Sequence, residues 1–285
     1  MTTLPRLLAL DLDGTVLGAK EALSPDIGPL LQEIRARGVI VVLATGRRLN
    51  NARWWSERLG IVGAPLVAAD GAVVTAADGR RLVDRPLPAR RWRQAWAIAQ
   101  EAGCEIRFYG ATVTAMARPG EADLQCWSGR IGRRQMGGGL PPGAWNTWRF
   151  PARLGRFAEQ APRLYKGSLI GRQSACLRPA VAALGMTFTT PADDANEFIR
   201  AGLSKATGLA ALIADLGLSW DQVWAVGDGA NDRDMLVSAG VGVAMGQASA
   251  ALRREAARVV APQAEGGLLE VLGPLAGAPV AGRLW

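Results

Sequence analysis

Two acidic residues, Asp11 and Asp13, lie two positions apart directly after a short apolar run near the start of the chain. A carboxylate pair can supply a nucleophile, a general acid or base, or ligands for a hard cation such as Mg²⁺. A turn or a helix cap explains one acid of such a pair and leaves the other unexplained. Because two acids this close repel each other, their spacing indicates chemistry that involves a cation.

A second acidic cluster, Asp228 and Asp232, lies in the segment GDGAND, which spans residues 227–232 and also contains Asn231. Its glycines allow the backbone to turn tightly. The segment follows the apolar run VWAV, as Asp11 follows LLAL. Open α/β sheets bind ligands at the carboxyl ends of their strands. We therefore expect both acidic clusters at one edge of one sheet.

Two further segments could hold an anion. Thr45, Gly46 and Arg47 follow the apolar run VIVVL, and a hydroxyl with backbone N–H groups at a strand-to-helix turn can bind an anion. A threonine at this position is equally common as a helix cap. Lys205 is expected to open a helix, where its charge opposes the helix dipole, and an isolated lysine there usually faces solvent. Either segment indicates an anion-binding site only in combination with the two acidic clusters.

The composition excludes several kinds of chemistry. The chain has 285 residues and no histidine, which excludes a His-based triad, a His general base and a His metal ligand. Three cysteines stand far apart without a CxxC pair, so neither a disulfide framework nor a thiolate metal site is expected. The net charge of +8 fits an anionic partner. Because the arginines are scattered, we do not expect nucleic-acid binding.

The apolar run at the N-terminus is interrupted by Asp11 and Asp13 and does not resemble a signal segment. No stretch of the chain reaches the roughly 20 apolar residues that a membrane helix needs. We expect a cytoplasmic protein without a membrane partner.

Alternating strand and helix patterns position these motifs. In the first third, strands are expected at residues 7–10, 39–43 and 66–69, with helices opening at Ser24-Pro25 and spanning 48–59. In the last third, helices are expected at 205–216 and 232–239, and strands at 223–226, 241–244 and 259–261. This order predicts an α/β fold with a doubly wound parallel sheet.

The middle of the chain differs in pattern. It contains several tryptophans, alternating segments at 104–109 and 112–116, and the Gly- and Pro-rich stretch 136–143, which is predicted to be a loop. We expect residues 83–193 to form an inserted α+β domain. The catalytic core is then expected to comprise residues 1–82 and 194–285.

The order DLDGT (11–15), TGR (45–47), Lys205 and GDGAND (227–232) resembles the four motifs of the haloacid dehalogenase superfamily. Within it, the chain resembles the Cof-like hydrolases with a large α/β cap of type IIB. Asp70-Gly71-Ala72, where relatives usually have Asn-Gly-Ala, and Glu265-Gly266-Gly267 add to the resemblance. The resemblance covers residues 7–79 and 197–272, whereas the middle agrees only in position and size. It implies a core of the HAD-like Rossmannoid type with an inserted cap that selects the substrate.

The resemblance also implies a magnesium-dependent phosphatase that works through a phospho-aspartate. Asp11 would be the nucleophile and Asp13 the general acid and base. The Asp11 carboxylate, the Asp13 backbone carbonyl and the Asp228 carboxylate would hold Mg²⁺, and Asp232 would support the metal or Lys205. The implied phosphate-binding residues are Thr45, Gly46, Arg47, Lys205 and Asn231.

The implied substrate is a small phosphorylated metabolite. Sugar phosphates are the first expectation, and pyridoxal phosphate, nucleotides, flavin mononucleotide and mannosyl-3-phosphoglycerate are alternatives. Arginines of the cap, such as Arg130, Arg133 and Arg134, could bind a second phosphate or a carboxylate. Two other functions remain open at this point: a sugar phosphomutase of the same superfamily and a non-catalytic phospholigand-binding protein.

Overall fold

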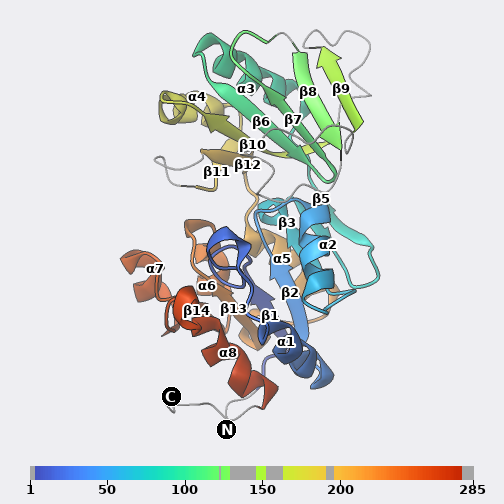
Figure 1. Ribbon diagram of the computed structural model, residues 1–285, viewed down its shortest axis with the longest axis vertical. Coiled ribbons are helices and arrows are strands. Elements are labelled where there is room, and N and C mark those ends of the chain that lie inside the picture. Colours follow the sequence, from blue (N-terminus) through green and yellow to red (C-terminus); the bar gives the residue numbers. More distant parts are fainter. Residues whose placement is uncertain (1–3, 122, 129–145, 152–162, 191–195, 278–285) are drawn as a thin grey trace. The chain divides into compact units, whose positions relative to one another are not determined.

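The computed structural model describes residues 4–121, 123–128, 146–151, 163–190 and 196–277 (Figure 1). The chain divides into two compact units. The first comprises Met1–Arg47, Ala52–Val83 and Ser204–Trp285, and the second comprises Arg48–Asn51 and Asp84–Leu203. The second unit thus runs past the predicted boundary at residue 193, because the strand Glu197–Arg200 is hydrogen-bonded into its sheet.

The first unit is built on an eight-stranded sheet in which six strands run parallel. Its order is β15-β14-β13-β1-β2-β3-β4-β5, and β4 runs antiparallel to β3. Leu7 to Leu10 are all fully buried, as expected for a strand covered on both faces. The strands are β1 (Leu7–Leu10), β2 (Ile40–Ala44), β3 (Leu66–Ala68), β4 (Val73–Thr75), β5 (Arg81–Asp84), β13 (Val223–Gly227), β14 (Val241–Ala244) and β15 (Arg258–Val259).

Helices cover this sheet, and the α/β class predicted from the sequence is confirmed. The helices are α1 (Ile27–Ala36), α2 (Leu49–Arg58), α5 (Lys205–Asp215), α6 (Arg233–Ser238), α7 (Ala250–Glu255) and α8 (Gly267–Ala276). Helices α5 and α6 pack on each other and on β3, β4, β13 and β14, whereas α1 packs on α8 and β2. Short 3-10 turns lie at Ala19–Glu21, Ala69–Gly71, Trp220–Gln222, Ala230–Asp232 and Gln263–Glu265.

The second unit is an antiparallel sheet of seven strands in the order β11-β12-β10-β6-β7-β8-β9. Buried and half-buried residues alternate along β6, and its buried Ile106 and Phe108 share a core with Trp92 and Trp96. The elements are α3 (Ala89–Glu101), β6 (Glu105–Gly110), β7 (Val113–Ala117), β8 (Asp123–Ser128), β9 (Asn146–Pro151), β10 (Leu164–Ile170), a 3-10 turn (Ser174–Leu177), α4 (Arg178–Ala183), β11 (Met186–Phe188) and β12 (Glu197–Arg200).

Most predicted elements agree with the observed ones to within one or two residues. One helix does not begin as predicted, because α1 starts at Ile27 and Ser24-Pro25 form a turn before it. The Ser24 hydroxyl accepts a hydrogen bond from the Asp26 N–H in this turn. The predicted loop at 136–143, together with Arg130, Arg133 and Arg134, lies outside the described residues.

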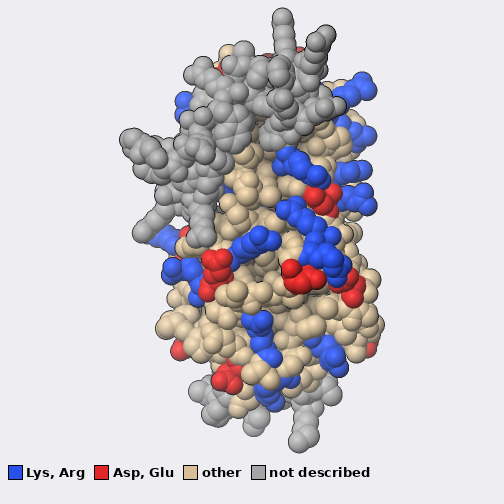
Figure 2. Space-filling model, turned by 90° about the vertical axis from the view of Figure 1, so that its right-hand side faces the viewer, with Lys and Arg blue, Asp and Glu red and all other residues tan. Residues whose placement is uncertain are grey.

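On the face drawn in Figure 2, Asp and Glu side chains lie beside Lys and Arg side chains. Among the described residues, no helix combines the length and the apolar character needed to cross a bilayer.

Candidate active site

Three neighbouring parallel strands bring the predicted motifs to one edge of the first unit's sheet. Strand β1 lies between β13 and β2, with Leu10 paired to both Val226 and Leu43. Asp11 directly follows β1, and its N–H donates a hydrogen bond to the Val226 carbonyl. Because all three strands end at this edge, Asp11 lies beside the residues that follow the other two strands.

Lys205 joins the nucleophile candidate to the second acidic cluster. Its Nζ lies 2.6 Å from Oδ1 of Asp11 and 2.6 Å from Oδ1 of Asp232. All three side chains are almost completely buried. Burial alone would lower the pKa of Lys205, but the carboxylates of Asp11 and Asp232 outweigh this effect and raise it. The ammonium group therefore stays charged inside the site.

The start of α5 places Lys205 at this position. Ser204 and Thr207 form a capping box, in which each side chain accepts a hydrogen bond from the other residue's backbone N–H. Gly71 packs so closely against the Ser204 carbonyl that a Cβ atom on it would collide, and its φ of +90° also favours glycine. The Asp-Gly-Ala segment after β3 thus allows α5 to approach the sheet edge.

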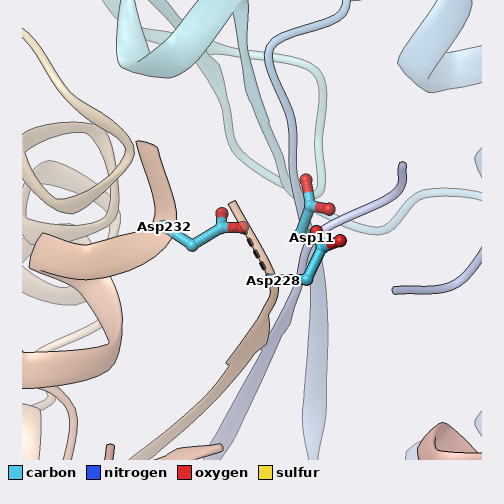
Figure 3. A group of neighbouring side chains, drawn as sticks. All are labelled: Asp11, Asp228 and Asp232. Atoms are coloured by element: carbon cyan, nitrogen blue, oxygen red, sulfur yellow. Dashed lines mark hydrogen bonds between the residues drawn. The ribbon is translucent and has the colours of Figure 1, made fainter. Parts of the chain in front are cut away.

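The carboxylate of Asp232 is fully engaged by the protein. Its Oδ1 accepts from Lys205, and its Oδ2 accepts from the Gly229 N–H at 2.9 Å. The same Oδ2 accepts from the Asp228 N–H at 3.0 Å (Figure 3). This arrangement suits a residue that supports Lys205 and the turn after β13 better than one that binds a metal directly.

Asp11, Asp228 and Asp232 form a carboxylate cluster whose ligand atoms lie within 4.8 Å of one another. In the described part of the chain, Oδ2 of Asp11 and Oδ1 of Asp228 accept no hydrogen bond, which leaves one oxygen of each for a cation. Burial, followed by the charge of Asp232, raises the pKa of Asp11 well above its usual value, and burial also raises the pKa of Asp228. A bound cation would reverse both shifts, and these hard oxygen donors fit Mg²⁺.

Gln247 orients Asp228. Its Nε2 donates to Oδ2 of Asp228 at 3.0 Å and to the Gly14 carbonyl at 2.6 Å. Gly14 has a φ of +85°, and a Cβ atom on it would collide with the Asp228 carboxylate. Gln247 was not among the residues predicted from the sequence, although its position shortly after β14 is a signal of the same kind as the one that identified Asp228.

Asp13 faces a different partner. Both of its carboxylate oxygens accept hydrogen bonds from Arg47, from Nε at 2.7 Å and from Nη2 at 2.6 Å. The third nitrogen of the guanidinium, Nη1, lies 2.9 Å from Oε1 of Glu21. Asp13 and Glu21 raise the pKa of Arg47 against the opposing effect of burial. The phosphate contact expected of Arg47 stays a prediction, and its link to Glu21 was not foreseen.

Thr45 and Gly46 lie in the turn after β2. Thr45 is fully buried, its N–H donates to the Val67 carbonyl, and its hydroxyl accepts from the Arg47 N–H at 3.1 Å. The Thr45 carbonyl also accepts from the Asp70 N–H. The turn is therefore fixed to the neighbouring strand β3 and to the segment that follows it.

Asn231 contacts the segment after β3. Its Nδ2 donates to Oδ1 of Asp70 at 2.8 Å. Asp70 is fully buried and adopts a left-handed backbone conformation with φ of +52°, as does Ala69 before it. In this structure the Asp70 carboxylate accepts the Asn231 amide, and the expected contact of Asn231 with phosphate or Asp11 stays a prediction.

The chain was compared with protein families and with known proteins. Residues 8–128 and 175–272 match the family described as haloacid dehalogenase-like hydrolase. Over 268 residues, 94% of each chain, it is 24% identical to the 5-amino-6-(5-phospho-D-ribitylamino)uracil phosphatase YcsE of Bacillus subtilis. It is 27% identical to the pyridoxal phosphate phosphatase YbhA of Escherichia coli over 266 residues, which cover 91% of this chain and 94% of that protein.

A solved structure shares the fold across both units. The HAD subclass IIB sugar phosphatase BT4131 superposes with a TM-score of 0.71 at 18% identity, covering 94% of this chain and 98% of that one. At this identity the likeness concerns the fold alone.

Proposed function

We propose that this chain, which belongs to the haloacid dehalogenase-like hydrolase family, is a magnesium-dependent phosphatase that cleaves a small phosphomonoester through a phospho-aspartate on Asp11. The observation that carries the proposal is the contact of Lys205 with Asp11, beside the one open oxygen of Asp228. This arrangement combines a nucleophile, a buried cation that can stabilise phosphoryl charge, and carboxylate oxygens suited to Mg²⁺.

Asp11 is the nucleophile in this proposal. One of its carboxylate oxygens attacks phosphorus while the bond from phosphorus to the leaving oxygen breaks. The Asp11 carboxylate, the Asp13 carbonyl and the Asp228 carboxylate would hold Mg²⁺, which would supply the positive charge that an anionic phosphate needs to approach an ionised carboxylate. Lys205 orients Asp11 through Oδ1.

Asp13 moves the proton in both steps. Its side chain is 30% exposed, in contrast to the buried Asp11, and can therefore reach a leaving group in solvent. It first donates a proton to the leaving oxygen, and it then takes a proton from the water whose oxygen attacks the phosphoryl group. The bond from phosphorus to Asp11 breaks in that second step, which releases inorganic phosphate and restores both aspartates. To donate, Asp13 must release at least one of its bonds to Arg47.

The phosphoryl oxygens are bound from the same sheet edge. Lys205 and the turn formed by Thr45 and Gly46 supply charge and hydrogen-bond donors. Asn231 belongs to this set if its side chain leaves Asp70 when substrate binds, and Arg47 belongs to it with a nitrogen that becomes free when Asp13 releases one of its two bonds. The related proteins are named as phosphatases of phosphorylated small molecules, which supports a phosphorylated metabolite, with sugar phosphates as the first class to test.

The proposal is tested by measuring phosphate release from a panel of phosphomonoesters that contains sugar phosphates, pyridoxal phosphate and p-nitrophenyl phosphate. We expect release with Mg²⁺, none with EDTA, and none from Asp11→Asn. Asp215→Asn, which removes the exposed partner of Arg80 in the same unit, is the matched control and should keep the parent rate. A sugar 1-phosphate converted to its 6-phosphate without free phosphate would replace the proposal by the mutase alternative.

A further inference from the structure

The guanidinium of Arg47 is held on three sides by residues of the first unit. Its Nε and Nη2 bind both oxygens of Asp13, its Nη1 lies 2.9 Å from Glu21, and its Cζ lies 5.7 Å from the ring centroid of Trp55. The Arg47 side chain is only 10% exposed and that of Glu21 only 20%. Arg47 therefore bridges two half-buried carboxylates, of which only Asp13 has a place in the proposed reaction.

We infer that Glu21 is a positioning residue, which fixes Arg47 and through it the orientation of Asp13. This inference rests on the proposed function, because Asp13 must deliver a proton from a defined direction. A planar guanidinium can bind one carboxylate with two parallel hydrogen bonds and a second with its remaining nitrogen. Asp13 releases one of its two bonds to Arg47 when it donates its proton, so the remaining bond must keep its direction. Without Glu21, Arg47 loses one of the contacts that limit its rotation, and that remaining bond loses its fixed direction.

The backbone around Glu21 supports this role. Lys20 and Glu21 have φ angles of 55° and 61°, so two successive residues with side chains adopt the left-handed conformation. This conformation is unfavourable for L-residues other than Gly, Asn and Asp, and it persists only where the surrounding structure holds it. The turn is closed by hydrogen bonds from the Gly18 N–H to the Ala22 carbonyl and from the Glu21 N–H to the Gly18 carbonyl.

The exposed pair of Arg80 and Asp215 provides a contrast. Arg80 binds Asp215 with two hydrogen bonds from an arginine whose side chain is 55% exposed, and Asp215 lies in the regular helix α5. This pair needs no unfavourable backbone conformation. At Glu21, by contrast, an unfavourable turn brings the Glu21 carboxylate to Arg47, which already binds Asp13. Such a turn is unexpected if Glu21 only adds charge to the surface.

Comparing substrates with poor and good leaving groups distinguishes a positioning role of Glu21 from a general structural role. An alkyl phosphate needs a proton on its leaving oxygen, whereas p-nitrophenolate leaves readily without one. Since kcat/KM covers the steps up to transfer of phosphate to Asp11, it reports the delivery of that proton. For Glu21→Gln, we expect kcat/KM to fall about 10-fold on an alkyl or sugar phosphate. On p-nitrophenyl phosphate it should fall less than about 3-fold.

A double-mutant cycle tests whether Glu21 acts through Arg47. Arg47→Lys keeps the charge but cannot bridge two carboxylates. If Glu21 acts through Arg47, Glu21→Gln should have little further effect in the Arg47→Lys background. Asp215→Asn should leave the ratio of the two kcat/KM values unchanged.

Two results would overturn the inference while leaving the phosphatase proposal in place. In the first, the parent is active, and the ratio of kcat/KM on the alkyl or sugar phosphate to kcat/KM on p-nitrophenyl phosphate is the same in Glu21→Gln as in the parent. In the second, kcat/KM of Glu21→Gln falls equally on both substrates and the thermal midpoint of unfolding also falls. Glu21 would then be a structural residue only. Failure of the proposed function would look different, because the parent protein itself would then release no phosphate from any substrate.

Discussion

Nζ of Lys205 lies 2.6 Å from Oδ1 of Asp11, although 194 positions separate the two residues in the chain. The same ammonium group binds Asp232, whose second oxygen accepts the N–H groups of Asp228 and Gly229. Lys205 thus connects the end of β1 to the turn after β13. A change at this residue should therefore affect both the stability and the chemistry of the site.

Lys205→Met should unfold more easily and should lose activity. Removing the cation leaves Asp11 and Asp232 buried without their partner, which costs about 3–5 kcal/mol for a buried ion pair. Phosphate release should fall by at least about 100-fold, since the variant lacks the cation that stabilises phosphoryl charge. Urea unfolding and the phosphate assay measure the two effects. A variant with parent stability would show that the buried pair contributes little.

Magnesium should stabilise the protein, and the effect should be larger at about pH 8 than at about pH 5. In the metal-free protein the pKa values of Asp11 and Asp228 are raised above those of the unfolded chain. At pH values between the pKa of each carboxyl in the unfolded chain and its higher pKa in the folded protein, the folded state binds more protons than the unfolded state. The contribution of these groups to stability therefore falls as pH rises through this range.

Bound Mg²⁺ should remove that fall, because it favours the ionised carboxylates. At about 100-fold its Kd, it should raise the free energy of unfolding by about 2.7 kcal/mol. Thermal unfolding with Mg²⁺ and with EDTA at several pH values tests this, with Asp228→Asn as the variant that should lose the response. An equal effect of Mg²⁺ at both pH values would contradict the assignment of the raised pKa values to metal ligands.

Gly14→Ala should weaken Mg²⁺ binding, whereas Gly38→Ala should not. The two glycines have φ angles of +85° and +86°, so both substitutions impose a similar backbone strain of about 1 kcal/mol. Only at Gly14 does the added Cβ collide with a side chain, the carboxylate of Asp228, while nothing lies within 4 Å of the position at Gly38. Titration calorimetry with Mg²⁺ should show at least about 10-fold weaker binding for Gly14→Ala alone.

Asp70→Asn should keep most of the activity, and Asp70→Ala should not. Asparagine retains an oxygen that can accept the Asn231 amide, and it adopts the left-handed conformation more readily than most residues. Alanine leaves that half-buried amide without its acceptor, at a cost of about 0.5–1.5 kcal/mol. Steady-state kinetics and urea unfolding of both variants measure the difference. If both lost activity equally, the carboxylate charge of Asp70 would itself be required.

The patterns visible in the sequence predict what is local. The apolar run LLAL predicts β1 with its observed bounds, and the strand pattern at 241–244 does the same for β14. The strand-end rule also predicts that Asp11 and Asp228 share one sheet edge, because parallel strands present the same end to a common side. A local pattern went wrong at Ser24-Pro25, where the two residues form a turn instead of the first turn of α1.

What the sequence does not predict are side-chain partners brought together by the fold. Asn231 and Asp70 are 161 positions apart, and Gln247 and Gly14 are 233 apart, so no spacing pattern connects them. Glu21 is hidden for a different reason. Its approach to Arg47 depends on a left-handed turn at Lys20 and Glu21, and residues of these types do not indicate such a turn.

The most direct test of the account is to trap the covalent intermediate. The protein is mixed with substrate and Mg²⁺, quenched in acid within the first turnovers, and digested for mass spectrometry. We predict one phosphoryl group on the peptide that contains Asp11, and none in Asp11→Asn or with EDTA. Full phosphate release by Asp11→Asn, or turnover in the parent without a phosphorylated peptide in a digest that preserves acyl phosphates, would contradict the role assigned to Asp11.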